Sequence, residues 1–528
     1  MVGLGRSGQA TARYLLSHVS DLDITHLTLV DSAQSKSLED FYLELQTRAR
    51  EQYGARLQID AHFGVNQVPE SANKTLYDLC VITPGLAPHT QLSQSAYHHS
   101  RQVISELELA YMQSPPGLIW VAVTGTNGKT TTTELMREVL SAGQVAAEED
   151  DHVGNRHRQV YSVGNIGTPA LELLDRVGEG DIFVAEVSSF QAARMSSFTP
   201  AIAALINLSS DHLDWHSDIA SYAADKCKIF ANSNAGNLVL VPGEDCLHPE
   251  ARPVIAQALD DARKRGAIVQ TVHAPQNLDF SSRDEKTAAT VALPNVNLVQ
   301  AEALPLPVNQ LPLRGQHNVI NAAFATAVAR YFTIPDARIA AVLRKIRPQP
   351  HRMQEVGRYA DVLYVNDSKS TNPDSAIQAL TAYVGLRLIL LLGGQSKSSD
   401  FAFADNSAYL DLARFALDRV DAIVLFGQAA DELRSVFDLV IAQQGMAQAE
   451  KTTVQATESD SLPQPPAKQK QQLFSFDTME QAIRYACDRA QPQQVVLLSP
   501  AHASFDEFDN YEERGDFFVR LVKECNHA

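Results

Sequence analysis

Short apolar runs recur along the chain, and stretches with apolar residues at helical spacing separate them. Continuous apolar runs indicate strands that are buried on both faces. Strands that alternate with helices predict parallel sheets, so we expect an α/β protein. The expected strands are 27–30, 79–82, 118–123, 182–185, 202–207, 238–241, 362–365, 388–392, 422–426 and 495–498, and the expected helices include 9–17, 133–140 and 318–331.

Proline-rich stretches at 114–117 and 347–350 divide this pattern into three blocks. A chain of 528 residues is long enough for about three domains at ~100–200 residues each. We therefore expect domains at 1–112, 113–348 and 349–528. Within the last, residues 447–472 are polar and proline-containing, which predicts a flexible surface insertion.

The composition limits the partners. The 44 basic and 62 acidic residues give a net charge of −18, which disfavours nucleic acids and anionic membrane surfaces. Anionic substrates would need local cations against this field. The sequence has no apolar stretch long enough to span a membrane and no secretory signal, and its five scattered cysteines fit a reducing cytoplasm.

The strongest local signal is a glycine-containing loop with a lysine between the strand 118–123 and the helix 133–140. Glycines let backbone N–H groups turn toward phosphates, Lys129 reaches the β- and γ-phosphates, and the Thr130 hydroxyl can ligate magnesium. Val123 replaces the first glycine of the usual pattern, so this is a shortened phosphate loop; the alternative is a plain strand-to-helix turn. The candidate ATP-binding residues here are Gly125, Thr126, Asn127, Gly128, Lys129, Thr130 and Thr131.

A second glycine pattern, Gly3-x-Gly5-x-x-Gly8, lies near the N-terminus, with Asp31 after the next strand. This spacing is typical of a turn that binds a pyrophosphate, and a UDP-sugar and NAD look alike to it. Only two residues precede Gly3, so we expect the first strand to be nearly absent. A tight turn without a ligand remains the alternative.

Polar residues also follow other strands, where ligands bind in open parallel sheets. Glu186 follows 182–185, and Asp211 and His212 follow 202–207; Glu186 and His212 are candidates for a second magnesium. Lys226 alone reads as a solvated lysine on an amphipathic helix. Asn318 and Asn321 are one turn apart and can face one ligand; the alternative for Asn318 is a plain N-cap.

The third block carries three polar clusters next to strands, at 350–352, 366–372 and 499–506, and a diglycine at 393–394 followed by Lys397. Clusters at successive strand ends favour the rim of a cleft over unrelated surface loops.

Taken together, the motifs resemble the Mur ligase family, and they occur in its order across essentially the whole chain. They are GTNGKTT, EVSSFQ, SSDHLDWH, YAADK, GQHNVINA, PHRM, NDSKSTN, LLLGGQSKSSDF and SPAHASFDEFDNYEERGDFF. The resemblance implies an N-terminal Rossmann-like UDP-binding domain, a central ATPase domain and a C-terminal Rossmann-like domain with the amino-acid site.

SKSTN and SPAHASFD resemble the family member that adds D-glutamate to UDP-N-acetylmuramoyl-L-alanine through an acyl phosphate, in peptidoglycan synthesis. The alternatives are another Mur-type ligase or a folylpolyglutamate synthetase, a dehydrogenase with NAD at Gly3–Gly8, and a nucleotide-gated regulatory or scaffold protein. The resemblance also implies a cytoplasmic monomer that uses ATP and two magnesium ions.

The resemblance also assigns roles to individual residues. Lys226 matches a carbamylated lysine that would join Thr130, Glu186 and His212 around magnesium, and Lys129, His212, Lys226 and Lys369 would be the catalytic group. The residues that would border the UDP-sugar are Arg6, Ser7, Asp31, Thr83 and Gly85, and the sugar-peptide would be contacted by Asn165. The residues that would contact ATP are Asn318, Asn321, Arg352 and Asp367. The residues that would contact D-glutamate are Lys369, Thr371, Ser504 and Phe505, with His351 and Lys397 nearby.

Overall fold

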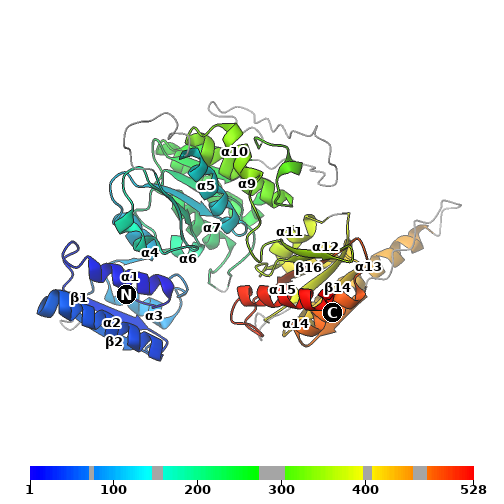
Figure 1. The fold of residues 1–528 in the computed structure, drawn as a ribbon, viewed down its shortest axis with the longest axis horizontal. Helices are drawn as coiled ribbons and strands as arrows, with labels where there is room; N and C mark the ends of the chain where they lie inside the picture. The colour runs from blue at the N-terminus through cyan, green and yellow to red at the C-terminus, as the bar shows by residue number, and fades with distance from the viewer. Residues whose placement is uncertain are drawn as a thin grey trace. The chain divides into compact units, whose positions relative to one another are not determined.

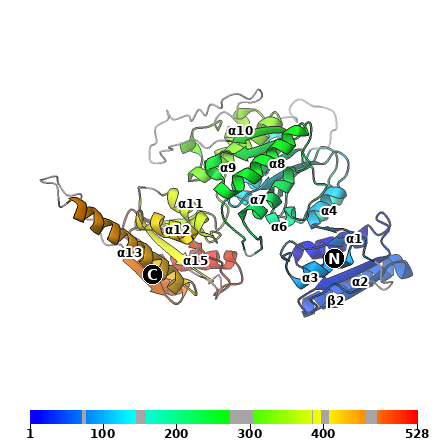
Figure 2. The ribbon, with the colours of Figure 1, turned by 180° about the vertical axis from the view of Figure 1, so that it is seen from behind.

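A computed structural model describes residues 1–70, 76–144, 158–213, 215–272, 304–383, 385–395, 407–455 and 472–527. The chain forms two compact units. The first contains the described residues of 1–307 and 320–345, and the second contains those of 308–319 and 346–528. Both units are built on largely parallel sheets with helices, which confirms the α/β class (Figures 1 and 2).

The larger sheet of the first unit has six parallel strands in the order β10-β9-β8-β5-β7-β6. Its central strands are apolar and fully buried, as the continuous apolar runs predict. The strands are β5 (Ile119–Thr124), β6 (Val160–Gly164), β7 (Ile182–Glu186), β8 (Ile202–Leu205), β9 (Leu238–Pro242) and β10 (Ile268–Val272). The helices are α5 (Lys129–Gln144), α6 (Ser189–Ala192), α7 (Ile219–Cys227), α8 (Arg252–Lys264), α9 (Gln316–Tyr331) and α10 (Asp336–Leu343), and the first four residues of α9 are counted in the second unit.

The N-terminal part of the same unit contains two short parallel pairs, β1 (His26–Asp31) with β2 (Gln58–Phe63), and β3 (Cys80–Val81) with β4 (Val103–Ile104). Val2 forms single parallel bridges to Val30 and Ile82. The first strand is therefore reduced to the single residue Val2, which agrees with the expectation that it is nearly absent. The helices here are α1 (Arg6–Ser17), α2 (Lys36–Tyr53), α3 (Gln91–His99) and α4 (Glu106–Met112).

The second unit has a six-stranded sheet in the order β11-β12-β16-β13-β14-β15, in which only β11 is antiparallel to its neighbour. Successive residues of β13 point to opposite faces: Leu390 packs with α11–α13, and Ile389 packs with α14 and α15. Figure 1 shows these two helix layers. The elements are β11 (Gln354–Tyr359), β12 (Val362–Asn366), α11 (Pro373–Thr381), β13 (Arg387–Gly393), α12 (Ser407–Leu417), β14 (Ala422–Phe426), α13 (Ala430–Gln455), β15 (Gln472–Phe476), α14 (Met479–Arg489), β16 (Gln494–Ala501) and α15 (Tyr511–His527).

The structure describes the first part of the predicted insertion. Residues 447–455 continue α13 as a helix, and the flexible insertion at 447–472 stays a prediction. Alanine, glutamine, glutamate and lysine favour helix, and the first proline of the segment comes only at Pro463. Residues 456–471 lie outside the described part of the chain.

Candidate active site

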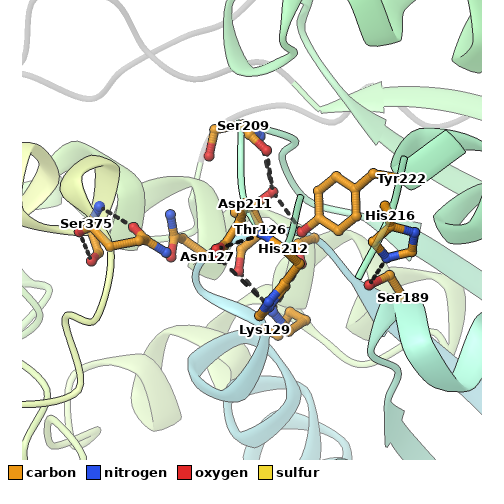
Figure 3. Close-up of polar contacts among 12 residues, drawn as sticks. Thr126, Asn127, Lys129, Ser189, Ser209, Asp211, His212, His216, Tyr222 and Ser375 are labelled. Atoms are coloured by element: carbon orange, nitrogen blue, oxygen red, sulfur yellow. Dashed lines mark hydrogen bonds and ion pairs between the residues drawn. The ribbon is translucent and has the colours of Figure 1, made fainter. Parts of the chain in front are cut away.

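The loop between β5 and α5 is held by the segment that follows the neighbouring strand β8. The side-chain oxygen of Asn207 accepts hydrogen bonds from the backbone N–H groups of Thr126 (3.0 Å) and Asn127 (2.9 Å), and its side-chain nitrogen donates to the Asn127 carbonyl (2.8 Å). The Thr126 hydroxyl donates to the Ser209 carbonyl at 3.1 Å and accepts from the Ser209 N–H at 3.0 Å (Figure 3). The sequence analysis did not single out Asn207, although its place at a strand end was a signal.

Gly128 closes this loop in a conformation that requires glycine. Its φ is +79°, and a Cβ atom there would lie 2.7 Å from the side-chain oxygen of Asn321 on α9. Asn321, a predicted ATP contact, therefore lies against the loop. The amide of Asn318 donates instead to the Arg314 carbonyl at 2.7 Å.

Two lysines converge on this loop. Lys129 Nζ donates to the carbonyls of Gly125 (3.0 Å) and Thr126 (2.8 Å), and Lys226 Nζ donates to the same Gly125 carbonyl at 2.8 Å. Lys226 is 1% exposed, so its reading as a solvated lysine is wrong: α7 turns this side chain inward, where it lies 4.5 Å from the centre of the Tyr222 ring. Burial, and then the charge of Lys129, hold the pKa of Lys226 well below its ordinary value.

Glu186 ends β7 beside this loop and is buried. One carboxylate oxygen accepts from the Asn165 amide at 2.9 Å, and the other is buried with no hydrogen-bond partner among the described residues. A buried carboxylate oxygen without a donor is suited to a cation.

His212 belongs to the loop after β8 and has a φ of +55°. Its ring centre lies 4.8 Å from that of Phe190, and its Nε2 lies 3.7 Å from a carboxylate oxygen of Asp211. Asp214 lies outside the described residues. The described residues contain no group of three or more His, Cys, Asp or Glu side chains arranged to hold a metal. A magnesium ion between Glu186, His212 and Thr130 would thus take further oxygens from phosphate or water, as magnesium usually does.

The N-terminal glycine turn has a different character. Both Asp31 carboxylate oxygens accept backbone N–H groups, from Leu4 (2.6 Å) and Ala33 (2.8 Å), so this carboxylate shapes the turn. Gly3 has a φ of +83° and lies directly against the Thr83 hydroxyl. The remaining residues predicted to border the UDP-sugar lie at the start of α1 or in the turn after β3, and Arg6, Ser7, Thr83 and Gly85 are all at least partly exposed, as is Asn165 after β6.

In the second unit, buried polar residues gather where β12 and β16 end. Asp367 accepts from the backbone N–H of Met353 (3.1 Å) and from the Ser499 hydroxyl (3.0 Å). Burial raises its pKa to about 7, although these two bonds and the charge of Arg352 oppose the rise. His351 has a φ of +62°, and its Nδ1 lies 3.1 Å from the amide nitrogen of Asn366, so the structure brings these predicted residues together.

Arg514 joins the two loops of this site, and the sequence analysis assigned it no role. It is fully buried and donates to the Ser368 carbonyl (2.7 Å) and hydroxyl (3.0 Å) and to the carbonyls of His502 (3.0 Å) and Ala503 (3.1 Å). One guanidinium thus fixes the loop that carries Lys369 against the loop that carries Ser504.

The predicted D-glutamate residues are less uniformly placed. Lys369 Nζ lies 5.0 Å from the centre of the Tyr511 ring, whereas Phe505 is 64% exposed. Tyr511 is therefore the aromatic side chain that accompanies Lys369. Ser504 is buried, Thr371 is half-buried, and Lys397 lies outside the described residues.

The strand, loop and helix around Lys129 define an α/β protein with a glycine-containing loop of the kind that binds phosphate. Residues 123–329 match the Mur ligase middle domain, and residues 351–502 match the Mur ligase, glutamate ligase domain. The chain belongs to the Mur ligase family, as its motifs predicted.

Relatives of known name align over nearly their whole length. UDP-N-acetylmuramoylalanine–D-glutamate ligase of Pelotomaculum thermopropionicum is 31% identical, over 99% of this chain and 96% of the relative. The enzymes of the same name from Desulfosudis oleivorans (31% identical, 100% and 97% covered) and Thermobifida fusca (30% identical, 99% and 97% covered) are equally similar.

Solved structures show the same fold at low identity. MurF from Acinetobacter baumannii has a TM-score of 0.51 at 16% identity, with 87% of this chain and 93% of that chain covered. The UDP-N-acetylmuramate–alanine ligase of Thermotoga maritima has a TM-score of 0.50 at 15% identity, with 99% and 98% covered. No helix within the described ranges combines the length and apolarity that a membrane crossing requires.

Proposed function

We propose that this chain is an ATP-dependent ligase that joins D-glutamate to UDP-N-acetylmuramoyl-L-alanine in peptidoglycan synthesis. The observation that carries this proposal is the near-full-length match to relatives of that name. The position of Lys129 in the ordered glycine-containing loop between β5 and α5 supports it. The three predicted domains, at 1–112, 113–348 and 349–528, would hold the UDP-sugar, ATP and D-glutamate. Five free cysteines and the net charge of −18 support a cytoplasmic enzyme, for which we propose a monomer.

The reaction joins two anions, so its main obstacle is charge. The terminal carboxylate of the UDP-sugar substrate attacks the γ-phosphate of ATP, which gives an acyl phosphate and ADP. The amine of D-glutamate then attacks the acyl carbon, and phosphate leaves. Catalysis of this kind depends on positioning and on charge stabilisation more than on covalent chemistry by the protein.

Within the first unit, the phosphate loop supplies backbone N–H groups and the Lys129 ammonium. Lys129 Nζ donates to two loop carbonyls, and phosphate oxygens are stronger acceptors that would draw it outward. Thr130, Glu186 and His212 would hold magnesium, which, when bound, neutralises phosphate charge. Asn321 would help to position the nucleotide beside Gly128.

Lys226 has the chemistry for carbamylation. Its lowered pKa favours the neutral amine, which is the form that attacks carbon dioxide. The amine nitrogen forms a bond to the carbon of CO₂, one proton leaves, and an anionic carbamate results. This change replaces an amine, whose protonated form Lys129 repels, with an anion that Lys129 attracts and that can ligate magnesium.

In the second unit, Lys369 and Ser504 lie on the two loops that Arg514 joins, and we assign them with Thr371 to D-glutamate. Arg352 and Asp367 would contact ATP, and His351 would support them.

Phosphate release in the presence of ATP and UDP-N-acetylmuramoyl-L-alanine tests the proposal. We expect release that depends on D-glutamate and that is abolished in Lys129→Ala. Release with L-alanine, a diamino acid or a dipeptide instead would favour another Mur-type ligase, and release with a folate and L-glutamate would favour a folylpolyglutamate synthetase. Nucleotide binding without any product would contradict an enzymatic role.

A further inference from the structure

Arg194 is a buried arginine that connects distant parts of the first unit. It follows α6 and is 4% exposed. Its guanidinium donates to the Thr83 carbonyl at 3.3 Å and to the Leu86 carbonyl, which lie 111 and 108 positions earlier in the chain. Its own carbonyl accepts the backbone N–H of Ser105, the N-cap of α4, at 3.4 Å.

The charge of Arg194 is compensated by dipoles and an aromatic ring. The guanidinium carbon lies 5.7 Å from the centre of the Trp215 ring. Burial lowers the pKa of Arg194, and a hydrogen bond with Tyr97 and the charge of Asp225 oppose this shift. Asp225 forms no ion pair with Arg194, and a buried charge without a carboxylate in direct contact costs stability relative to an apolar side chain of similar size. The charge therefore points to a role beyond packing.

The segment that Arg194 holds is the turn predicted to border the UDP-sugar. The Leu86 N–H donates to the Thr83 carbonyl at 3.4 Å, and the Thr83 N–H donates to the Val2 carbonyl at 2.9 Å. The turn is thus tied to residue 2 at one end and to the guanidinium through two carbonyls. Gly85, by contrast, is exposed, and a Cβ atom there would meet nothing within 4 Å. One edge of the turn faces a cation, and the other stays open to a ligand.

We infer that Arg194 is a positioning residue for the UDP-sugar substrate. It fixes the turn Thr83–Leu86 in the shape that receives the uridine diphosphate, and it places a positive charge behind that turn. This inference rests on the proposed function. Arg194 would thus affect binding of the UDP-sugar, although it comes soon after Glu186 in the part of the first unit that is proposed to bind ATP.

Binding of UDP and of ADP, measured separately by calorimetry, tests the inference. Arg194→Met keeps the length of the side chain and removes its charge and donors. We expect its dissociation constant for UDP to rise roughly 10- to 100-fold, since hydrogen bonds from a charged donor are lost, while the constant for ADP changes less than about twofold. Arg194→Lys keeps the charge but loses the two-pronged geometry, so we expect an intermediate rise.

Asn232→Ala is the matched control. Asn232 donates to the carbonyls of Ser196 (2.8 Å) and Phe198 (3.3 Å), so it also holds the segment after α6, but among the described residues it forms no hydrogen bond with the turn at 83–86. We expect this variant to bind both nucleotides normally. Unchanged UDP affinity in Arg194→Met, or an equal loss of UDP and ADP affinity, would overturn the inference while the proposed function stands. If Arg194→Met does not fold, the same comparison in Arg194→Lys decides. Wild-type protein that binds ADP but neither UDP nor the UDP-sugar would overturn both.

Discussion

At the scale of single residues, the first unit places two lysines on one carbonyl oxygen. Lys129 and Lys226 both donate to Gly125, and only Lys226 is fully buried. Two ammonium groups this close repel each other, and the buried one loses more solvation. Lys226 is therefore the lysine whose proton is lost first and whose amine is available for chemistry.

Removing carbon dioxide tests this reading of Lys226. In buffer depleted of CO₂ and bicarbonate, ligase activity measured by phosphate release should fall severalfold and recover when bicarbonate is added. Lys226→Arg should be nearly inactive under both conditions, since a guanidinium does not form the carbamate. Lys228→Arg is the control, because Lys228 is partly exposed and pairs with Asp225 at 2.9 Å; it should respond to bicarbonate like wild type.

Gly128→Ala tests the closure of the phosphate loop. The added Cβ would combine a φ of +79° with a 2.7 Å approach to Asn321. We expect about 1–3 kcal/mol lower stability in chemical unfolding and at least roughly tenfold weaker ATP binding, because the loop must shift. Gly236→Ala shares the positive φ (+96°) but has open space around its Cβ. If Gly236→Ala weakened ATP binding equally, loop geometry at Gly128 would not be the cause.

At the scale of elements, burial separates the strands that were predicted from those that were missed. The central strands of both sheets were found as apolar runs. Six of the strands that the structure describes were missed. Two of them, β2 and β4, belong to the short N-terminal pairs, and the other four, β6, β10, β11 and β15, are the two edges of each six-stranded sheet. Edge strands have one open side and mixed composition, as in QEVGRY of β11, so their hydrophobic signal is weak. Their positions follow from pairing with neighbours, which the local sequence does not encode.

Helix α4 contains a buried glutamate that makes the free energy of unfolding depend on pH. Glu106 lies in its first turn, is 2% exposed, and accepts the Leu171 N–H at 3.1 Å. Burial raises its pKa to about 7, from a model-compound value of 4.5. Its stabilising contribution is complete below pH 4.5, where both states are protonated. It is lost as the pH rises to about 7, since the unfolded chain ionises more readily.

The unfolding free energy should therefore contain a component, on the order of 3 kcal/mol, that disappears between about pH 4.5 and 7. Glu106→Gln should remove this component, which denaturant titrations across the pH range would measure. Glu39→Gln, at an exposed position in the first turn of α2, is the control and should keep the wild-type profile. A Glu106→Gln profile that parallels wild type would contradict the assignment.

At the scale of the whole molecule, the charge opposes the proposed substrates. The chain carries −18, and each proposed substrate is an anion, so long-range repulsion slows encounter while Lys129, Lys369 and Arg352 act at short range. Salt screens distant charges first, because the Debye length falls from ~30 Å at 0.01 M to ~8 Å at 0.15 M.

We expect kcat/KM for the UDP-sugar to stay constant or rise severalfold between these ionic strengths at fixed free magnesium. A steep fall would mean that local cations steer the encounter. Unfolding by urea, which is uncharged, measured at both salt concentrations would control for changes in stability.

The sequence by itself determined the α/β class and the family, and it predicted the phosphate loop and the candidate residues, because buried parallel strands and glycine loops leave strong local patterns. Only the tertiary structure decided that Lys226 is buried against Lys129, that Asn207 and Arg514 hold the loops, that Tyr511 rather than Phe505 accompanies Lys369, and that Arg194 reaches the turn at 83–86. These contacts join residues far apart in the chain. Burial and pKa depend on what surrounds a side chain in space, and spacing along the sequence carries little of that information.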